Sequence, residues 1–166
     1  MKMDKSLNQQ VKIKPLTLDE RNGEKPVIRH ITISETYEST IFHDYLTTAS
    51  VKYQYHIISD RLKLLISLYL LNYDWTPVVL IDQFDKGYLY WFLEPININC
   101  ISSKTSFNHD RTLKELIIDK QNIGKNPVFQ VNTQIQKANI VRLDLAESML
   151  RRGFLGIDFI KVGVEE

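Results

Sequence analysis

The side chains of this chain that could carry out acid–base chemistry are its histidines and their neighbouring carboxylates. Asp44 and Asp110 each directly follow a histidine, as an orienting carboxylate follows a general base in some nucleases. Adjacent residues on a strand point to opposite faces, however, so such pairs are more often surface polar residues. The histidines also lack the spacing of a helical zinc-binding pair. They are His30, His43, His56 and His109.

Carboxylates could instead hold a divalent cation through oxygen ligands. Asp82, Asp85 and Glu94 are near one another in the sequence, but their spacing fits no known loop and Lys86 lies among them. The single cysteine, Cys100, excludes an internal disulfide and a multi-cysteine metal site. With no neighbouring histidine or cation, it is expected to be an inert thiol. We therefore predict no catalytic residue, no metal and no cofactor.

Residues 73–94 combine aromatic and acidic side chains. Four acids and one base give this stretch a net charge of −3. In residues 88–93 one aromatic row alternates with a second apolar row, so the strand is either covered on both faces or presents one row to a partner. Aromatic residues are enriched at interfaces, and acids suit a basic partner, although a solvated loop would also be acidic. The predicted partner-binding residues are Trp75, Asp82, Phe84, Asp85, Tyr88, Tyr90 and Glu94.

The composition is that of an ordinary globular protein. Of 166 residues, 43% are hydrophobic and 25% are charged, and the formal net charge is +1. So small a charge provides no field that would draw the protein to nucleic acid or to an anionic membrane, and we predict neither partner. The longest apolar run, residues 62–73, is too short to cross a bilayer. The first residues lack the apolar core of a secretory signal, so a cytoplasmic location is expected. The oligomeric state stays open.

The element that the sequence predicts most clearly, and that could position these side chains, is a helix over residues 60–71. Ser59 is expected to cap it, and Asn72 can take the left-handed conformation that ends it. The helix has two apolar stripes, which predicts burial between layers of the core. The broad stripe comprises Leu62, Leu65, Ile66, Tyr69 and Leu70. The second stripe comprises Leu64, Leu68 and Leu71.

Period-two patterns and turn residues predict the remaining elements. A second helix is expected at residues 35–46 and a third at 144–152, with Asp144 as its cap and Gly153 as its left-handed end. We predict an α+β fold: a single domain over residues 26–166 with a mixed, mostly antiparallel sheet and two or three packed helices. Residues 1–25 form a polar N-terminal arm that is partly mobile. Strands are expected at residues 27–34, 51–58, 78–81, 88–93, 113–119, 127–131 and 157–162.

Between residues 53 and 162 the order of these pieces resembles the immunity proteins of bacterial polymorphic toxin systems. The matching motifs are structural ones, and the first fifty residues match no family. The matching motifs are Ile57-Ile-Ser-Asp-Arg-Leu62 opening a leucine-rich helix, Pro77-Val-Val-Leu80, Tyr88-Leu-Tyr-Trp-Phe-Leu93, Ser106-Phe107, residues 113–119, Pro127-Val-Phe-Gln-Val131, Ile140-Val141 and Gly153-Phe-Leu-Gly-Ile-Asp-Phe159.

The resemblance implies a non-catalytic α+β protein that binds a cognate toxin and so protects the cell that produces it. Such toxins are delivered by neighbouring cells through contact-dependent or type VI secretion systems. Two other functions stay open: a small hydrolase or nuclease that uses the scattered His and Asp residues, and an adaptor module of a secretion system. The identity of the toxin does not follow from the resemblance, because surfaces vary freely on one fold.

Overall fold

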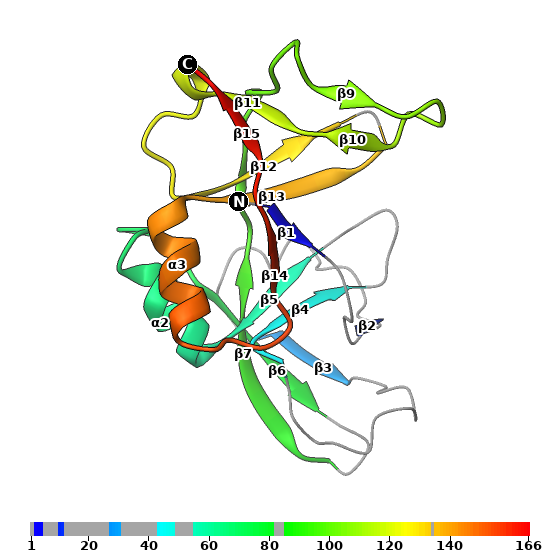
Figure 1. Cartoon of the computed structure of the whole chain (residues 1–166). Coiled ribbons are helices and arrows are strands. Elements are labelled where there is room, and N and C mark those ends of the chain that lie inside the picture. The colour runs from blue at the N-terminus through cyan, green and yellow to red at the C-terminus, as the bar shows by residue number, and fades with distance from the viewer. Residues whose placement is uncertain are drawn as a thin grey trace. The chain divides into compact units, whose positions relative to one another are not determined.

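The fold is given by a computed structural model, which describes residues 2–4, 10–11, 27–30, 43–48, 55–81, 85–133 and 135–166 (Figure 1). These residues form an α+β fold of short strands in several sheets with two α-helices, and antiparallel strand pairs predominate. The predicted fold class is therefore confirmed. Contacts within the chain define two compact units. The first contains Met1–Lys5, Pro95–Arg152 and Ile157–Glu166, and the second contains Ser6–Glu94 and Gly153–Gly156.

The second unit is built on a six-stranded sheet in the order β2-β4-β5-β7-β6-β3. Strand β7 is antiparallel to both of its neighbours, β5 and β6. The β6–β7 pair is the predicted hairpin, with Ile81 opposite Gly87. The strands are β2 (Gln10–Val11), β3 (Val27–His30), β4 (Tyr45–Thr48), β5 (His56–Ser59), β6 (Thr76–Ile81) and β7 (Gly87–Leu93).

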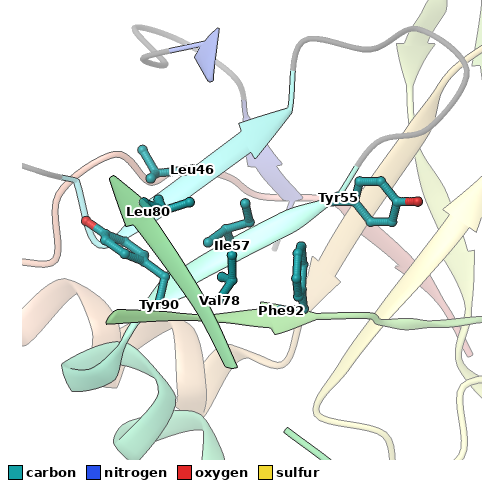
Figure 2. Packing of buried hydrophobic residues seen from close by; sticks show 7 residues of the cluster. All are labelled: Leu46, Tyr55, Ile57, Val78, Leu80, Tyr90 and Phe92. Atoms are coloured by element: carbon teal, nitrogen blue, oxygen red, sulfur yellow. The ribbon is translucent and has the colours of Figure 1, made fainter. Parts of the chain in front are cut away.

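One face of this sheet carries the main apolar cluster of the unit (Figure 2). Because side chains alternate along a strand, each strand contributes every second residue to this face. Tyr90 and Phe92 come from β7, and Tyr88 packs against the cluster at its margin. The aromatic row of β7 therefore belongs to the core. The complete cluster is Leu46, Tyr55, Ile57, Val78, Leu80, Tyr90 and Phe92.

Helix α2 (Asp60–Ser67) packs against β5 and β7. The Ser59 hydroxyl caps it by accepting the Leu62 N–H at 3.2 Å. Helical hydrogen bonding continues past Ser67, because the Leu70 N–H donates to the Ile66 carbonyl at 2.9 Å. Asn72 has a φ of 60°. The predicted start of the helix is thus confirmed. Its predicted end at residue 71 is wrong, because the helix ends at Ser67 with Leu68 as a right-handed C-cap, and Asn72 lies in the turn beyond it.

The two predicted apolar stripes differ in how far they are exposed. Leu62, Leu65 and Ile66 are buried, as predicted for the broad stripe. In the second stripe Leu64 is 59% exposed, Leu68 73% and Leu71 80%. The prediction that the helix is covered on most sides is therefore wrong. The sheet covers one face of the helix, and none of the described residues covers the other.

The first unit contains a five-stranded sheet in the order β14-β1-β13-β12-β8. Its centre is the hairpin of β12 and β13, in which Phe129 pairs with Ile140. One apolar cluster of this unit contains both of these residues and the buried Cys100. The strands are β1 (Lys2–Asp4), β8 (Ile96–Asn97), β12 (Val128–Asn132), β13 (Lys137–Val141) and β14 (Asp158–Ile160).

Helix α3 (Leu143–Arg151) follows β13 and buries Leu145, Ala146 and Met149. Its start differs from the prediction. Arg142 occupies the N-cap position, and its guanidinium binds both carboxylate oxygens of Asp144 at 2.8 Å. Asp144 therefore lies in the first turn, where an acid favours the helix dipole, and is not the cap. Gly153 follows with a φ of 61°, as predicted.

Two small sheets complete the first unit. Strands β11 (Ile117–Asp119) and β15 (Gly163–Glu165) pair in parallel. The Glu165 carboxylate accepts hydrogen bonds from the Ser102 hydroxyl and from the Lys104 ammonium group. These bonds fix β15 along β11. The other elements are the hairpin of β9 (Ser106–Phe107) and β10 (Leu113–Glu115) and the 3₁₀ helix η1 (Lys120–Asn122).

The predicted helix over residues 35–46 falls mostly outside the described residues, but its end can be compared. Tyr45–Thr48 is strand β4, so the helix prediction is wrong there. Tyr45 and Leu46 lie on opposite faces of a sheet, which explains why both can be buried. Within the predicted arm, Lys2–Asp4 and Gln10–Val11 are strands. The arm's mobility and the single domain stay predictions.

Replacing Leu65 with Ala should lower the free energy of unfolding by about 2–5 kcal/mol, because it removes a buried side chain and leaves a cavity. Urea unfolding followed by circular dichroism measures the change. The control is Leu68→Ala on the exposed stripe, which should stay within about 0.5 kcal/mol of wild type. Equal losses from the two variants would contradict the observed packing of α2.

The attachment of β15 should weaken in acid. The hydrogen bonds from Lys104 and then from Ser102 lower the pKa of Glu165 from its ordinary value of 4.5. A lowered folded-state pKa gives stabilisation that is present above about pH 4.5 and is lost as the pH falls through the folded-state value. Glu165→Gln should therefore destabilise the protein at pH 7 and lose that effect near pH 3. Glu166→Gln is the control, since the Glu166 side chain is largely exposed.

Candidate functional site

The predicted partner-binding residues differ in exposure where the structure describes them. Asp85 and Glu94 are exposed, and Trp75 and Tyr88 are half-buried. Lys86 places its ammonium group 5.2 Å from the centre of the Tyr88 ring. Asp82 and Phe84, between β6 and β7, lie outside the described residues.

Tyr90 lies in the core, contrary to its predicted role in a surface. Its ring is part of the buried cluster, and its hydroxyl donates to the His43 carbonyl at 3.0 Å. Burial, together with the negative charge of Asp44, raises the pKa of the phenol well above its ordinary value. The reason is the register of β7, which turns the Tyr90 row inward and the Leu89 and Trp91 row toward the other face.

An aromatic pair, Tyr73 and Trp75, lies next to the residue that follows β7. The centres of the Tyr73 and Trp75 rings are 4.5 Å apart. The Tyr73 hydroxyl accepts the Glu94 N–H at 2.6 Å, and burial raises its pKa. These contacts hold the backbone next to two exposed acids, Asp74 and Glu94. Among the described residues no ion pair involves either acid.

Three large apolar residues at the end of α2 and just after it are exposed: Leu64, Leu68 and Leu71, hereafter the leucine row. The sequence shows the i, i+4, i+7 spacing of these residues, but not that they are exposed. Their exposure could be predicted only with knowledge of which face of α2 packs on the sheet.

Trp91, also missed by the sequence interpretation, lies beside the base of this helix. The Asp60 carboxylate accepts its indole N–H at 2.9 Å, and the Lys63 ammonium group lies 4.2 Å from the centre of its ring. These contacts tie the first turn of α2 to β7. They also occupy the polar groups of Asp60 and Lys63, which are therefore less available to a partner.

The carboxylate of Asp44 is buried and has several hydrogen-bond donors around it. It accepts hydrogen bonds from the Ser59 hydroxyl at 2.6 Å, from the Arg61 guanidinium at 2.8 Å and from the Leu155 N–H at 2.9 Å. Because three donors already occupy it, Asp44 is poorly suited to act as the orienter of a histidine base. Its geometry is that of a structural clamp.

The neighbouring glycine confirms how closely the chain packs at this clamp. Gly156 has a φ of 82°, and a Cβ placed there would lie 2.6 Å from the Tyr45 carbonyl oxygen. The same Cβ would lie 2.7 Å from the Cβ of His43. Only glycine combines this conformation with so close an approach.

The histidines do not combine into an acid–base site among the residues that the structure describes. His43 has a buried Nδ1 without a hydrogen-bond partner there. His56 is buried on β5, with Nδ1 2.6 Å from the Tyr45 hydroxyl and its ring stacked on that of Tyr45. His109 lies in the exposed β9–β10 turn, in an open hollow that Phe107 and Lys114 also line. His30 is on β3.

The candidate metal ligands are likewise dispersed. In the described part of the chain no group of three or more His, Cys, Asp or Glu side chains could hold a metal ion. Of the predicted acids, Asp82 lies outside that part. Cys100 is buried, and burial raises the pKa of its thiol, with the charge of Asp119 adding to the effect. A thiol held in its neutral form is a poor nucleophile.

No helix among the described residues is long and apolar enough to cross a membrane. Comparisons with protein-family models, with curated proteins and with solved structures found no match for this chain. The candidate site therefore depends on the geometry above: exposed leucines at the end of α2 and in the turn after it, and acids beside an ordered aromatic pair.

Replacing Asp44 with Ala should lower the free energy of unfolding by on the order of 3 kcal/mol. The change removes three hydrogen bonds to a buried charged acceptor and leaves partly buried donors without that partner. Thermal and urea unfolding measure the loss. Asp74→Ala, which removes an exposed carboxylate without an ion pair, is the matched control and should change stability by less than about 0.5 kcal/mol. A neutral Asp44→Ala variant would show that the clamp is dispensable.

Proposed function

We propose that the protein is an immunity protein that binds and neutralises a cognate antibacterial toxin in the cytoplasm of the producing cell. The observation that carries the proposal is the leucine row at the end of α2 and in the turn that follows it, where Leu64, Leu68 and Leu71 are 59%, 73% and 80% exposed. The resemblance of residues 53–162 to immunity proteins of polymorphic toxin systems agrees with it.

An exposed apolar row supports binding more than catalysis. Contiguous apolar surface on a folded protein commonly marks a site where another macromolecule docks. The opposite face of α2 is buried through Leu62, Leu65 and Ile66, so the row is held on a packed element. A rigid element loses little conformational entropy on binding, which favours the tight complex that an inhibitor needs.

A hydrolase or nuclease finds less support in the same residues. Asp44 is occupied by three donors, and His56 is occupied by Tyr45. His109 and Asp110 remain accessible in the β9–β10 turn, but Asp110 accepts hydrogen bonds from Thr112 that lower its pKa. An adaptor of a secretion system would also use a docking surface. It differs from an immunity protein in its partner, because immunity genes lie beside a toxin gene.

Co-expression with the toxin encoded by the adjacent gene tests the proposal. The toxin alone should stop growth, and the two proteins together should restore growth and co-purify as a stable complex. His109→Ala with Asp110→Ala should protect as well as wild type, because an inhibitor needs no acid–base pair. Failure of the wild-type protein both to bind and to protect would refute the proposed function. Loss of protection with retained binding in the double variant would indicate an enzyme.

A further inference from the structure

We propose that Gly153–Gly156 is a strap that opens and closes on the Asp44 carboxylate while the six-stranded sheet stays folded. These four residues belong to the second unit, although Arg152 and Ile157 on either side of them belong to the first. The inference goes beyond the proposed function, because it concerns a conformational equilibrium of the protein alone and needs no partner.

Hydrogen bonds of one residue hold the middle of the strap. The Leu155 N–H donates to the Asp44 carboxylate at 2.9 Å. The Leu155 carbonyl accepts the Asp44 N–H at 3.0 Å and the Tyr45 N–H at 3.3 Å. Lifting Leu155 breaks all three bonds at once, so the three N–H groups form one opening unit.

Arg61 contacts the strap from the first turn of α2. Its guanidinium donates to the Gly153 carbonyl at 3.4 Å and lies 4.5 Å from the centre of the Phe154 ring. The Arg61 side chain is 58% exposed, and water weakens contacts of a charged group at such a position. Its bond to Asp44 does not involve the strap, so Arg61 keeps this partner when the strap lifts.

Little apolar burial holds the strap in place. Leu155 is 46% exposed and Phe154 is half-buried. Strands β4 and β5, by contrast, bury Leu46 and Ile57 completely. Segments with few buried apolar contacts open at a lower free energy than the core to which they are attached. The strap is therefore expected to open before the sheet unfolds.

Glycines at both ends of the strap supply its hinges. Gly153 has a φ of 61° and Gly156 a φ of 82°. Glycine adopts positive and negative φ about equally well, because it has no Cβ. Rotation at these two positions can lift the strap without strain in Phe154 and Leu155.

The closed strap leaves a polar atom beneath it unsatisfied. His43 Nδ1 is buried and has no hydrogen-bond partner in the described part of the chain. Gly156 packs directly on this side chain, since a Cβ at Gly156 would lie 3.0 Å from the His43 Cγ. A buried polar atom without a partner is costly, and water can reach it once the strap has moved. Opening therefore recovers part of the free energy that the lost bonds cost.

The buried carboxylate tolerates the opening for a related reason. Asp44 still accepts hydrogen bonds from the Ser59 hydroxyl at 2.6 Å and from the Arg61 guanidinium at 2.8 Å. Water replaces only the Leu155 N–H. A buried charge is strongly destabilising when it loses its partners, and here two of them remain. The open and closed states thus differ by a few exchangeable hydrogen bonds.

Amide hydrogen exchange of the wild-type protein, followed by NMR at low urea concentrations, tests the inference. The N–H groups of Leu155, Asp44 and Tyr45 should exchange together, about tenfold or more faster than the Ser59 N–H. Ser59 is the internal reference, because its N–H donates to the Asp44 carbonyl at 2.8 Å and takes no part in the strap. Exchange of the three amides should depend little on urea, because local opening exposes little surface.

Gly156→Ala should shift the equilibrium toward the open strap, because the new Cβ would lie 2.6 Å from the Tyr45 carbonyl oxygen. Exchange of the three amides should become about tenfold faster again. The free energy of unfolding should fall by no more than the free energy of strap opening in the wild type. Gly153→Ala is the matched control: it has the same kind of left-handed φ, but no atom lies within 4 Å of the added Cβ.

Three results would overturn the inference. The first is exchange of Leu155, Asp44 and Tyr45 with the rate and urea dependence of Ser59, which would mean that the strap opens only when the unit unfolds. The second is exchange of the three amides at unrelated rates. The third is failure of Gly156→Ala to fold, because a strap that opens on its own cannot be required for the sheet. Joint, urea-independent exchange that Gly156→Ala accelerates more than Gly153→Ala supports it.

Discussion

The buried carboxylate of Asp44 is the interaction on which the second unit most depends. It joins three pieces of chain that are far apart in the sequence: the start of β4, the first turn of α2, and residues 153–156. Backbone hydrogen bonds support the same junction, since the Ser59 N–H donates to the Asp44 carbonyl at 2.8 Å and the Asp44 N–H donates to the Leu155 carbonyl at 3.0 Å. A buried charge is costly unless donors surround it, and here each donor comes from a segment that must be positioned.

This clamp also orients the proposed binding surface. Ser59 both donates to Asp44 and caps α2, and Arg61 binds Asp44 from the first turn of the same helix. The contacts of Asp60 and Lys63 with Trp91 hold the helix to β7 from the other side. The start of α2 is thus fixed at two points, so the direction in which Leu64, Leu68 and Leu71 project is set by polar contacts at its base. An interface built on this helix needs no ordering when the partner arrives.

The sequence predicted those features that depend on local chemistry. Strands β6 and β7, the hairpin between them and the Ser59 cap follow from alternation and capping preferences. The sequence could not predict which row of β7 faces the core, because both rows are apolar and only the pairing with β5 and β6 decides. The contact of Asp44 with Leu155 spans 111 residues, and no local pattern encodes it. Asp144 does not take its expected capping role, because it lies in the first turn of the helix, where the Arg142 guanidinium binds its carboxylate; the Arg142 side chain makes no capping hydrogen bond of its own.

Local sequence patterns also could not predict that the leucine row is exposed. This exposure is the reason to expect the leucines to contribute to the binding energy. A period of 3.6 residues shows that α2 has two apolar stripes, but a sheet can cover only one side of a helix. Leu64 is exposed on the side of α2 that the sheet leaves open, and Leu68 and Leu71 are exposed where the helix has ended, whereas the whole chain has a net charge of only +1. With so small a net charge, any long-range attraction to a partner would come from local charges, such as the exposed Asp74 and Glu94. Such charges chiefly guide the encounter, while burial of the leucines governs how long the complex lasts. For the toxin that we propose as the partner, the exposed leucines would supply the apolar contact, and neutralisation would need no chemical step.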